Sequence, residues 1–452
     1  MRPFSRSWLS LVTCTLLVTA VLSFTVPSAP VRAQVVSWQA AAQLDPAFLQ
    51  EWVQVVYDAA MREATNPPNS ARIYGYAGVT LYEALFPGMP LNRSLVGQLN
   101  GLRDLPYPDE TQQYDWTVVT AAAMQTVMDK LFVNAAPETY ESFVALREAH
   151  IAASLETFDA EIVEGSAAFG DELGAAILEW VSDDNYDEIR RDSAAYEIPT
   201  GDPSLWVLTN PNARPAEPLW GQVRPFALDY ADECLVPLNY EFSTDENSAF
   251  YQQAVEIMDF NNNSTPEMRE TAEWWVDTPG LTGAPAGHWM LIGSQLVDQL
   301  DLDTERAAEM YAMLGISVAD AFISCWSAKY QFNLLRPETY IQEYISRRWE
   351  PYIETPPFPE YPSGHSVVSA AAGDALTNLF GQVVFTDSAN TFRGLRERTY
   401  YSFEQAATEA AISRLYGGIH FRTAVENGMR QGRCVTERIF DRIVLDPVAQ
   451  GE

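Results

Sequence analysis

Lysine and histidine are the residues that this sequence has least of. Among 452 residues there are four histidines, and the lysines are Lys130 and Lys329. Chemistry that needs an imidazole or an amine therefore has very few candidate residues. Positive charge is scarce overall, because 28 Lys and Arg residues stand against 61 Asp and Glu residues, which gives a formal net charge of −33. Such an acidic chain is a poor partner for nucleic acid or for an anionic membrane surface, since both attract basic proteins.

Long apolar runs are also scarce, and the clearest one lies at the N-terminus. Arginines precede an apolar stretch over residues 8–26, and a small-residue cleavage pattern ends at Ala33. This order of features predicts a signal peptide over residues 1–33 and export to a secreted or periplasmic location. A membrane anchor and a lipidated Cys14 are the alternatives. We find no later segment long and apolar enough to span a bilayer, so we expect no membrane association after cleavage.

Cysteine is the third rare residue. Behind the expected cleavage site the chain has Cys234, Cys325 and Cys434. Their spacing fits no zinc pattern. An odd number allows one disulfide and one free thiol in an oxidising compartment, and three buried, unreactive cysteines are the alternative.

The apolar residues that are present follow helical spacing. With 47% hydrophobic and 20% charged residues the chain can bury a core. Helical spacing extends from residue 46 to about 183 and resumes at residue 247, whereas the prolines of residues 184–240 favour an extended path. A strong helical stretch over residues 304–335 must end near Arg336, because Pro337 disfavours helix in the residue before it.

This pattern predicts an all-α fold of two packed helical bundles. We expect an N-terminal helical region over residues 34–240, in which residues 184–240 form an extended connector. A C-terminal catalytic bundle over residues 241–452 is expected to contain an oxyanion site.

Three C-terminal segments concentrate the rare residues. They cover residues 329–337, residues 361–366 with the sequence Tyr-Pro-Ser-Gly-His-Ser, and residues 413–420. Taken singly, such residues are usually solvated charges, ordinary helix caps or buried histidines. Their occurrence together, in segments built from the scarcest residue types, favours a single functional site.

The spacing within the segments suggests an anion site. Lys329 and Arg336 are seven residues apart, so on one helix they would project from the same face and converge on one anion. Ser363 stands before an apolar helical run, and the free N–H groups of that helix start would face an anion. Arg414 and His420 are separated by glycines that allow a tight bend.

The motifs Lys-x6-Arg-Pro, Pro-Ser-Gly-His and Ser-Arg-x5-His resemble those shared by vanadium-dependent haloperoxidases and the type 2 phosphatidic acid phosphatase superfamily. The resemblance covers residues 329–420 well and is not specific for the first 240 residues. It implies an α-helical bundle fold with one pocket that holds vanadate or phosphate.

The same resemblance implies how the oxyanion is held. Lys329, Arg336 and Arg414 would neutralise its equatorial oxygens. The Ser363 hydroxyl and the Gly364 N–H would donate further hydrogen bonds.

The two histidines receive different roles from the resemblance. His365 would be the acid and base, and His420 would be the apical ligand to vanadium or, in a phosphatase, the phosphorylated nucleophile. Relatives often carry an Asp four residues after the last histidine, where it orients the ring, but here that position is Ala424. Glu426 or a backbone carbonyl is the expected replacement. A vanadate ligand needs orientation more than activation, so Ala424 favours a peroxidase over a phosphatase.

Further positions resemble the surroundings of the site in this family. Trp326 and Phe358 stand where chloroperoxidases place aromatic rings beside vanadate, although both are equally compatible with an ordinary core. Asp277 resembles an acid that contacts an active-site arginine, and we expect His288 to be structural.

We therefore predict a vanadium-dependent haloperoxidase that uses hydrogen peroxide to oxidise chloride or bromide to hypohalous acid. Its cofactor is expected to be vanadate, in a site that phosphate can share, and its partners are peroxide, halide and a small organic acceptor. The sequence is compatible with an oligomer. One alternative is an exported acid phosphatase with a phosphohistidine intermediate, and another is a protein that sequesters phosphate or vanadate without turnover.

Overall fold

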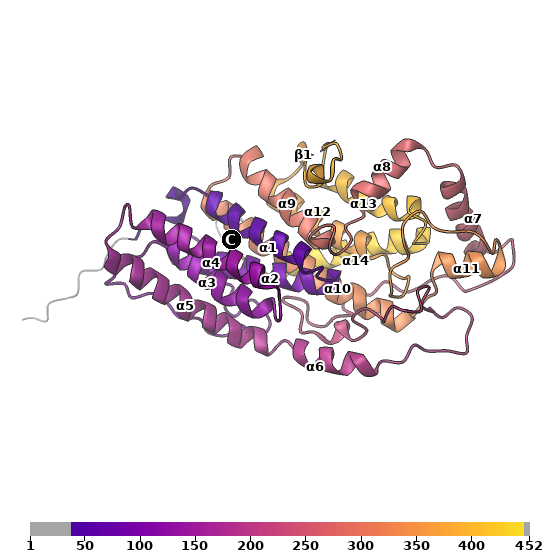
Figure 1. Ribbon diagram of the computed structural model, residues 1–452, viewed down its shortest axis with the longest axis horizontal. Helices are drawn as coiled ribbons and strands as arrows, with labels where there is room; N and C mark the ends of the chain where they lie inside the picture. Colours follow the sequence, from indigo (N-terminus) through magenta and orange to yellow (C-terminus); the bar gives the residue numbers. More distant parts are fainter. Residues whose placement is uncertain (1–37, 447–452) are drawn as a thin grey trace, which may run out of the picture. The chain divides into compact units, whose positions relative to one another are not determined.

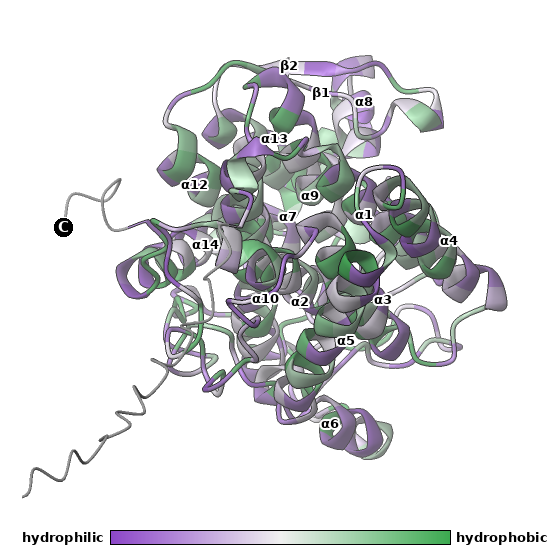
Figure 2. Ribbon diagram, turned by 90° about the vertical axis from the view of Figure 1, so that its left-hand side faces the viewer, coloured by the Kyte–Doolittle hydropathy of each residue, from purple (hydrophilic) through white to green (hydrophobic). Residues whose placement is uncertain are grey.

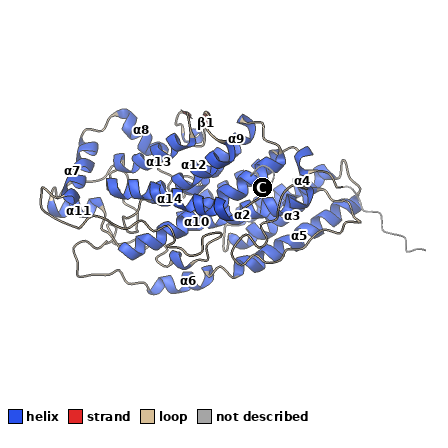
Figure 3. Ribbon diagram, turned by 180° about the vertical axis from the view of Figure 1, so that it is seen from behind, coloured by secondary structure: helices blue, strands red, loops and turns tan. Residues whose placement is uncertain are grey.

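The computed structural model describes residues 38–446. The predicted signal peptide lies outside the described residues and stays a prediction. The expected all-α fold is confirmed (Figure 3), because helices dominate the described chain. The α-helices are α1 (Ala47–Arg62), α2 (Pro67–Leu85), α3 (Trp116–Leu131), α4 (Pro137–Ser154), α5 (Ala160–Ser182), α6 (Tyr186–Asp192), α7 (Ala249–Asn262), α8 (Pro266–Trp274), α9 (Ala284–Gln299), α10 (Thr304–Phe332), α11 (Pro337–Tyr344), α12 (Gly364–Phe380), α13 (Phe403–Tyr416) and α14 (Arg422–Arg442).

The helices pack as an N-terminal and a C-terminal group (Figure 1). In the first group α3 packs against α2, α4 and α5, and in the second group α12 packs against α10, α13 and α14. The long helix α10 runs beside α2 and joins the two groups. Their backbones approach so closely that a Cβ atom on Gly78 would lie 2.3 Å from the carbonyl oxygen of Tyr311. A glycine is therefore required at this crossing.

Helix α10 corrects one expectation from the sequence. By length and composition it is long and apolar enough to cross a membrane, so the prediction that no later segment meets this test was wrong. Its most apolar 18-residue window is, however, 100% buried inside the protein. The helix is apolar because other helices surround it, whereas the surface helix α6 is mainly hydrophilic (Figure 2).

The end of α10 corrects a second expectation. The helix stops at Phe332, where Asn333 adopts a left-handed conformation with φ of 46°, and Arg336 then precedes the first residue of α11, Pro337. Lys329 and Arg336 therefore do not share one helix face, because the helix ends between them. Both side chains still approach one loop, residues 358–362, which the tertiary fold places between them.

The proline-rich residues 184–240 follow a mostly irregular path, interrupted by α6 and two short 3-10 helices, Ser193–Ala195 and Trp220–Gln222. Cys234 of this segment forms a disulfide with Cys434 of α14. Cys325, which lies in α10, is a buried free thiol. The predicted domain boundary near residue 240 stays a prediction. A two-stranded antiparallel sheet, β1 (Phe385–Asp387) and β2 (Arg398–Tyr400), follows α12.

Candidate active site

The second and third motifs meet at a cavity of about 710 Å³. Gly364, His365, Arg414 and His420 all line this cavity. The first motif does not line it but lies directly behind it, since Arg336 contacts the ring of His420. The fold therefore brings all three segments together around one end of one cavity.

The start of α12 presents backbone N–H groups to the cavity. Ser363 precedes the helix, and its hydroxyl accepts a hydrogen bond from the N–H of Ser366 at 3.4 Å. The N–H of Ser363 is itself taken by the carbonyl of Ala424. A Cβ on Gly364 would lie 3.5 Å from the ring of Trp326, which is an ordinary contact distance. The first N–H groups of a helix have no partner within the helix and attract anions.

His420 is held between a carboxylate and a guanidinium. Its Nδ1 lies 2.9 Å from Oε1 of Glu360, and its Nε2 lies 3.2 Å from Nη1 of Arg336. An arginine donates hydrogen bonds and cannot accept them, so Nε2 carries a lone pair and Nδ1 carries the proton. Burial, followed by the charge of Arg336, lowers the pKa of His420 well below its ordinary value. The ring is therefore neutral and has one basic nitrogen on the side of the buried arginines.

Glu360 is the carboxylate that the sequence analysis missed. Its Oε1 accepts hydrogen bonds from Nδ1 of His420 and from the N–H of Phe421 at 2.8 Å, and its side chain is fully buried. Glu426, the expected replacement for the missing Asp, lies instead on α14 near Arg422. The physical reason is that α14 begins at Arg422, so residues 420–424 do not form the helical turn that the expectation required. The available signal was a carboxylate immediately before the Tyr-Pro-Ser-Gly-His motif.

Two buried arginines supply positive charge. Arg336 donates from Nε to the carbonyl of Phe358 and from Nη1 to that of Ile419, and among the described residues its Nη2 has no partner. Arg414 donates from Nη2 to the carbonyl of Ala272 and from Nε to the neighbouring hydroxyl of Ser413. Burial lowers the pKa of each guanidinium to about 10, so both remain charged at neutral pH.

The ammonium group of Lys329 donates its hydrogen bonds to backbone carbonyls. Its Nζ donates to the carbonyls of Pro359 and Glu360, each at 2.9 Å, and to the carbonyl of Pro362. Burial lowers the pKa of the ammonium group to about 7. In this arrangement the lysine fixes the loop that carries Glu360 and reaches an anion through its charge rather than through a free N–H.

His365 faces the cavity from the first turn of α12. The ring interacts with the backbone carbonyl of Trp275, and its Nε2 has no hydrogen-bond partner among the described residues. Burial, together with the charge of Arg414, lowers the pKa of His365 well below its ordinary value. A neutral imidazole with a free nitrogen beside a cavity can accept and return a proton.

Asp277 belongs to a buried chain of three titratable groups. Its carboxylate lies 3.0 Å from Nδ1 of His288, whose Nε2 lies 2.9 Å from Oδ2 of Asp387. Burial opposes charge here, but the two carboxylates raise the pKa of His288 to about 10. Burial likewise opposes ionisation of Asp277, yet His288, His365 and Arg414 hold its pKa below the ordinary value. Asp277 lines the cavity, so this chain leads from the cavity wall into the core.

Trp326 and Phe358 contact each other beside the site, with ring centroids 4.9 Å apart. Phe358 lines the cavity, and the indole N–H of Trp326 donates to the carbonyl of Ala216. The Lys329 ammonium lies over both rings, at 5.7 Å and 5.1 Å from their centroids. These rings therefore exclude water from one side of the buried charges.

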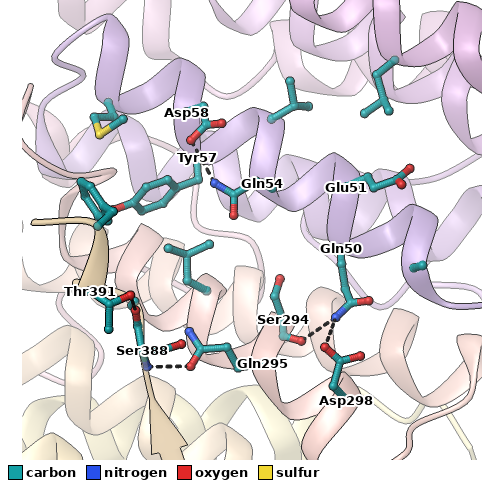
Figure 4. A pocket seen from close by; sticks show the side chains of 17 residues that line it. Gln50, Glu51, Gln54, Tyr57, Asp58, Ser294, Gln295, Asp298, Ser388 and Thr391 are labelled. Atoms are coloured by element: carbon teal, nitrogen blue, oxygen red, sulfur yellow. Dashed lines mark hydrogen bonds between the residues drawn. The ribbon is translucent and has the colours of Figure 1, made fainter. Parts of the chain in front are cut away.

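A second hollow in the described structure has a different character. It measures about 880 Å³ between α1, α9 and residues 388–392, and it includes none of the predicted site residues. Its polar side chains bond one another (Figure 4), as in the pairs Gln54 with Asp58 and Gln50 with Asp298. This hollow lacks the convergent cations and the histidines of the other cavity.

The residues around the first cavity fit a bound oxyanion. Nη2 of Arg336 and Nε2 of His365 are buried atoms without a partner among the described residues. Arg414, the start of α12 and His420 line this space, and Arg336 lies directly behind it with its Nη1 against Nε2 of His420. Such a donor set suits a tetrahedral or trigonal oxyanion.

Comparisons with known proteins agree with this geometry. A family model described as the VCPO second helical-bundle domain matches residues 309–445. The crystal structure of a bacterial vanadium-dependent iodoperoxidase is 34% identical to this chain with a TM-score of 0.83, and the match covers 89% of this chain and 97% of that one. No curated protein matches the chain by sequence.

A more distant structure shares the fold. A holo-type bacterial vanadium-dependent chloroperoxidase is 14% identical with a TM-score of 0.66, over 86% of this chain and 96% of its own. The chain belongs to the vanadium-dependent haloperoxidases, which are oxidoreductases that act on peroxide.

Proposed function

We propose that this protein binds vanadate at the cavity floor and oxidises halide with hydrogen peroxide to hypohalous acid. The observation that supports this most directly is the fixed state of His420, whose Nδ1 faces Glu360 and whose Nε2 presents its lone pair to Nη1 of Arg336. A single neutral nitrogen with a lone pair, surrounded by cations, is suited to ligate an oxyanion centre.

Each side chain then has a defined role. Arg336 and Arg414 would hold the oxygens of vanadate, assisted by the hydroxyl of Ser363 and the N–H of Gly364 at the start of α12, and His420 would be its protein ligand. Lys329 would add charge and hold the loop of residues 359–362 in place. Phosphate could occupy the same position.

When bound, vanadate supplies a Lewis acid that activates peroxide toward halide. His365 would accept a proton from the incoming peroxide at Nε2 and return it to the leaving oxygen. The neutral ring suits this task, because burial and Arg414 keep its pKa low. Asp277, held by His288, would act on Arg414 and His365 through its charge.

For the halide, we propose bromide or chloride on the basis of the aromatic pair Trp326 and Phe358. Iodide belongs in the same assay, since the 34% identical crystal structure is that of an iodoperoxidase. We also propose that the protein acts outside the cytoplasm, which the expected signal peptide and the disulfide between Cys234 and Cys434 support.

The test compares purified protein with and without vanadate, using iodide, bromide and chloride with peroxide and, separately, a phosphate monoester. We expect vanadate-dependent halide oxidation. Efficient ester hydrolysis without vanadate, and no halide oxidation with it, would replace this proposal by the phosphatase.

Two variants test the assignment of the histidines. His420→Ala should lose stable vanadium binding, measured as metal content after gel filtration. His365→Ala should keep vanadium and lose about 10²–10⁴-fold in turnover. Vanadium retained in the first variant and lost in the second would reverse the two roles.

A further inference from the structure

The cavity above the site is larger than the inorganic reactants need. Its volume is about 710 Å³, whereas one water molecule occupies about 30 Å³ in the liquid and peroxide and halide ions are of similar scale. Pockets of roughly 300–1,000 Å³ are typical of sites that hold organic ligands. The cavity therefore has room for an organic molecule in contact with the floor where His365 and His420 lie.

The walls of the cavity are largely apolar and rigid. Phe322 and Phe358 line one side and belong to the aromatic cluster around Trp326. The remaining apolar lining includes five prolines, which have fixed backbones and no N–H to satisfy. The lining prolines are Pro67, Pro279, Pro285, Pro356 and Pro357. Such walls favour an apolar occupant over a hydrated one.

The charges of the lining are mostly engaged with the protein. Asp277 is bound to His288, Glu273 accepts a hydrogen bond from the hydroxyl of Tyr352, and Arg393 donates to the carbonyl of Glu273. An uncharged occupant fits these conditions best.

One polar group of the lining has no partner. Thr355 lines the cavity and is 6% exposed, and its hydroxyl makes no hydrogen bond among the described residues. Buried hydroxyls are normally paired, so an unpaired one in a cavity wall is a candidate contact for a ligand.

Two side chains of the cavity lining are exposed to solvent, Leu281 at 43% and Tyr352 at 42%. Their exposure suits the entry of an apolar molecule.

We propose that this cavity binds an uncharged phenolic compound and that its ring is halogenated there before hypohalous acid leaves. The proposal rests on the proposed haloperoxidase function and names its organic acceptor. Peroxide, halide and a proton give hypohalous acid and water. The phenol ring then attacks the halogen, so that a carbon–halogen bond forms, the oxygen–halogen bond breaks, and the displaced ring proton joins the hydroxide to make water. An electron-rich ring is the acceptor that such an electrophile requires.

The experiment is a competition between two acceptors of equal reactivity. Free phenol fits the cavity, and phenol coupled to a long polyethylene glycol chain does not. The vanadate-loaded enzyme, supplied with peroxide and a halide that it oxidises, should halogenate free phenol at least tenfold more than the coupled phenol. Reagent hypohalous acid should show the intrinsic ratio. An enzyme ratio equal to the reagent ratio would overturn the proposal.

Matched variants locate the binding site. Thr355→Val removes the unpaired hydroxyl and should reduce the preference roughly threefold to tenfold, the effect of one neutral hydrogen bond. Thr339→Val is its control, since Thr339 also has an unpaired buried hydroxyl but does not line the cavity. Leu281→Asp should likewise reduce the preference, whereas Val384→Asp, at an exposed position that does not line the cavity, should not. Equal preferences in all four variants would contradict the assignment of this cavity.

Two further measurements separate this proposal from the function on which it rests. Halide oxidation is followed as the total amount of halogenated product. If no such product forms, the haloperoxidase function is refuted, whereas the binding of phenol in the cavity is not. Calorimetric titration of phenol into protein without vanadate should detect binding that Leu281→Asp weakens and Val384→Asp does not. Halide oxidation together with no phenol binding would refute the acceptor site alone.

Discussion

A carboxylate beside an imidazole decides which ring nitrogen carries the proton. In this protein Glu360 does so for His420, whereas position 424, where the family resemblance led us to look for an Asp, is Ala424. Outer partners of a ligating histidine typically contribute about 10–100-fold to metal affinity. Glu360 therefore acts through His420 as a positioning residue.

Glu360→Gln should weaken vanadate binding by roughly 10–100-fold. The amide can turn either its N–H or its oxygen toward Nδ1 of His420, so it no longer holds the proton on that nitrogen. Calorimetric titration of the metal-free protein measures the affinity, and ¹⁵N NMR of the histidines reports the tautomer. Glu426→Gln is the control and should change neither. An unchanged affinity in Glu360→Gln would contradict the role.

His288 contributes a pH-dependent stability. Its pKa of about 10 in the folded protein exceeds the ordinary value of 6.5, so its contribution is complete below about pH 6.5 and is lost as the pH rises through about 10. His288→Gln leaves the buried carboxylates Asp277 and Asp387 without their cation, and we expect a loss of about 3–5 kcal/mol at neutral pH. Thermal unfolding should show a difference from the wild type that narrows toward alkaline pH.

His150→Gln is the control for this pH series. Burial lowers the pKa of His150, so its ring is already neutral at pH 7 and its contribution should not change between neutral and alkaline pH. A constant difference between wild type and His288→Gln across the same range would show that His288 is not charged in the folded protein.

At the scale of the elements, the site depends on how closely two helices pack. Helix α12 carries Ser363 and His365 at its start and packs against α14. Their contact requires Gly432, where a Cβ atom would lie 2.2 Å from the carbonyl oxygen of Val367. Because that oxygen belongs to the first turn of α12, any displacement there moves the site.

Gly432→Ala should therefore destabilise the protein by about 1–3 kcal/mol and weaken oxyanion binding as well. Gly165→Ala in α5 is the matched control, because its Cβ would meet no atom closer than 3.8 Å. Alanine is favoured over glycine in a helix by about 1 kcal/mol, so the control should be neutral or stabilising. Denaturant unfolding and phosphate titration measure the two effects, and equal behaviour of the two variants would refute the packing argument.

For the molecule as a whole, one covalent bond connects distant parts of the chain. The disulfide between Cys234 and Cys434 joins residues 200 positions apart and ties the irregular 184–240 segment to α14. That segment has few helices to hold it, so the cross-link restricts it in both the folded and the unfolded protein. The bond also agrees with an oxidising location, which we propose for this protein.

Removing the bond with Cys234→Ser/Cys434→Ser should cost about 2–5 kcal/mol of unfolding free energy. A reductant should lower the melting temperature of the wild type and leave that of the double variant unchanged. A wild type insensitive to reductant under conditions that break the bond would show that the cross-link contributes nothing.

The sequence by itself was sufficient for the helical class and for finding the motifs of residues 329–420. Helix formation and capping depend on neighbours within a few residues, so Ser363 before its apolar run and Pro337 after Arg336 are readable locally. The motifs were recognisable because lysine and histidine are so rare in this chain.

Only the tertiary structure decided which side chains meet. Glu360 and His420 are 60 residues apart, and His288 and Asp387 are 99 apart, so no local pattern links them. The same holds for Lys329, whose protons the sequence assigned to an anion and the fold directs to backbone carbonyls of residues 359–362. Buried polar groups must find partners wherever the packing places them, and that choice is made between elements rather than within them.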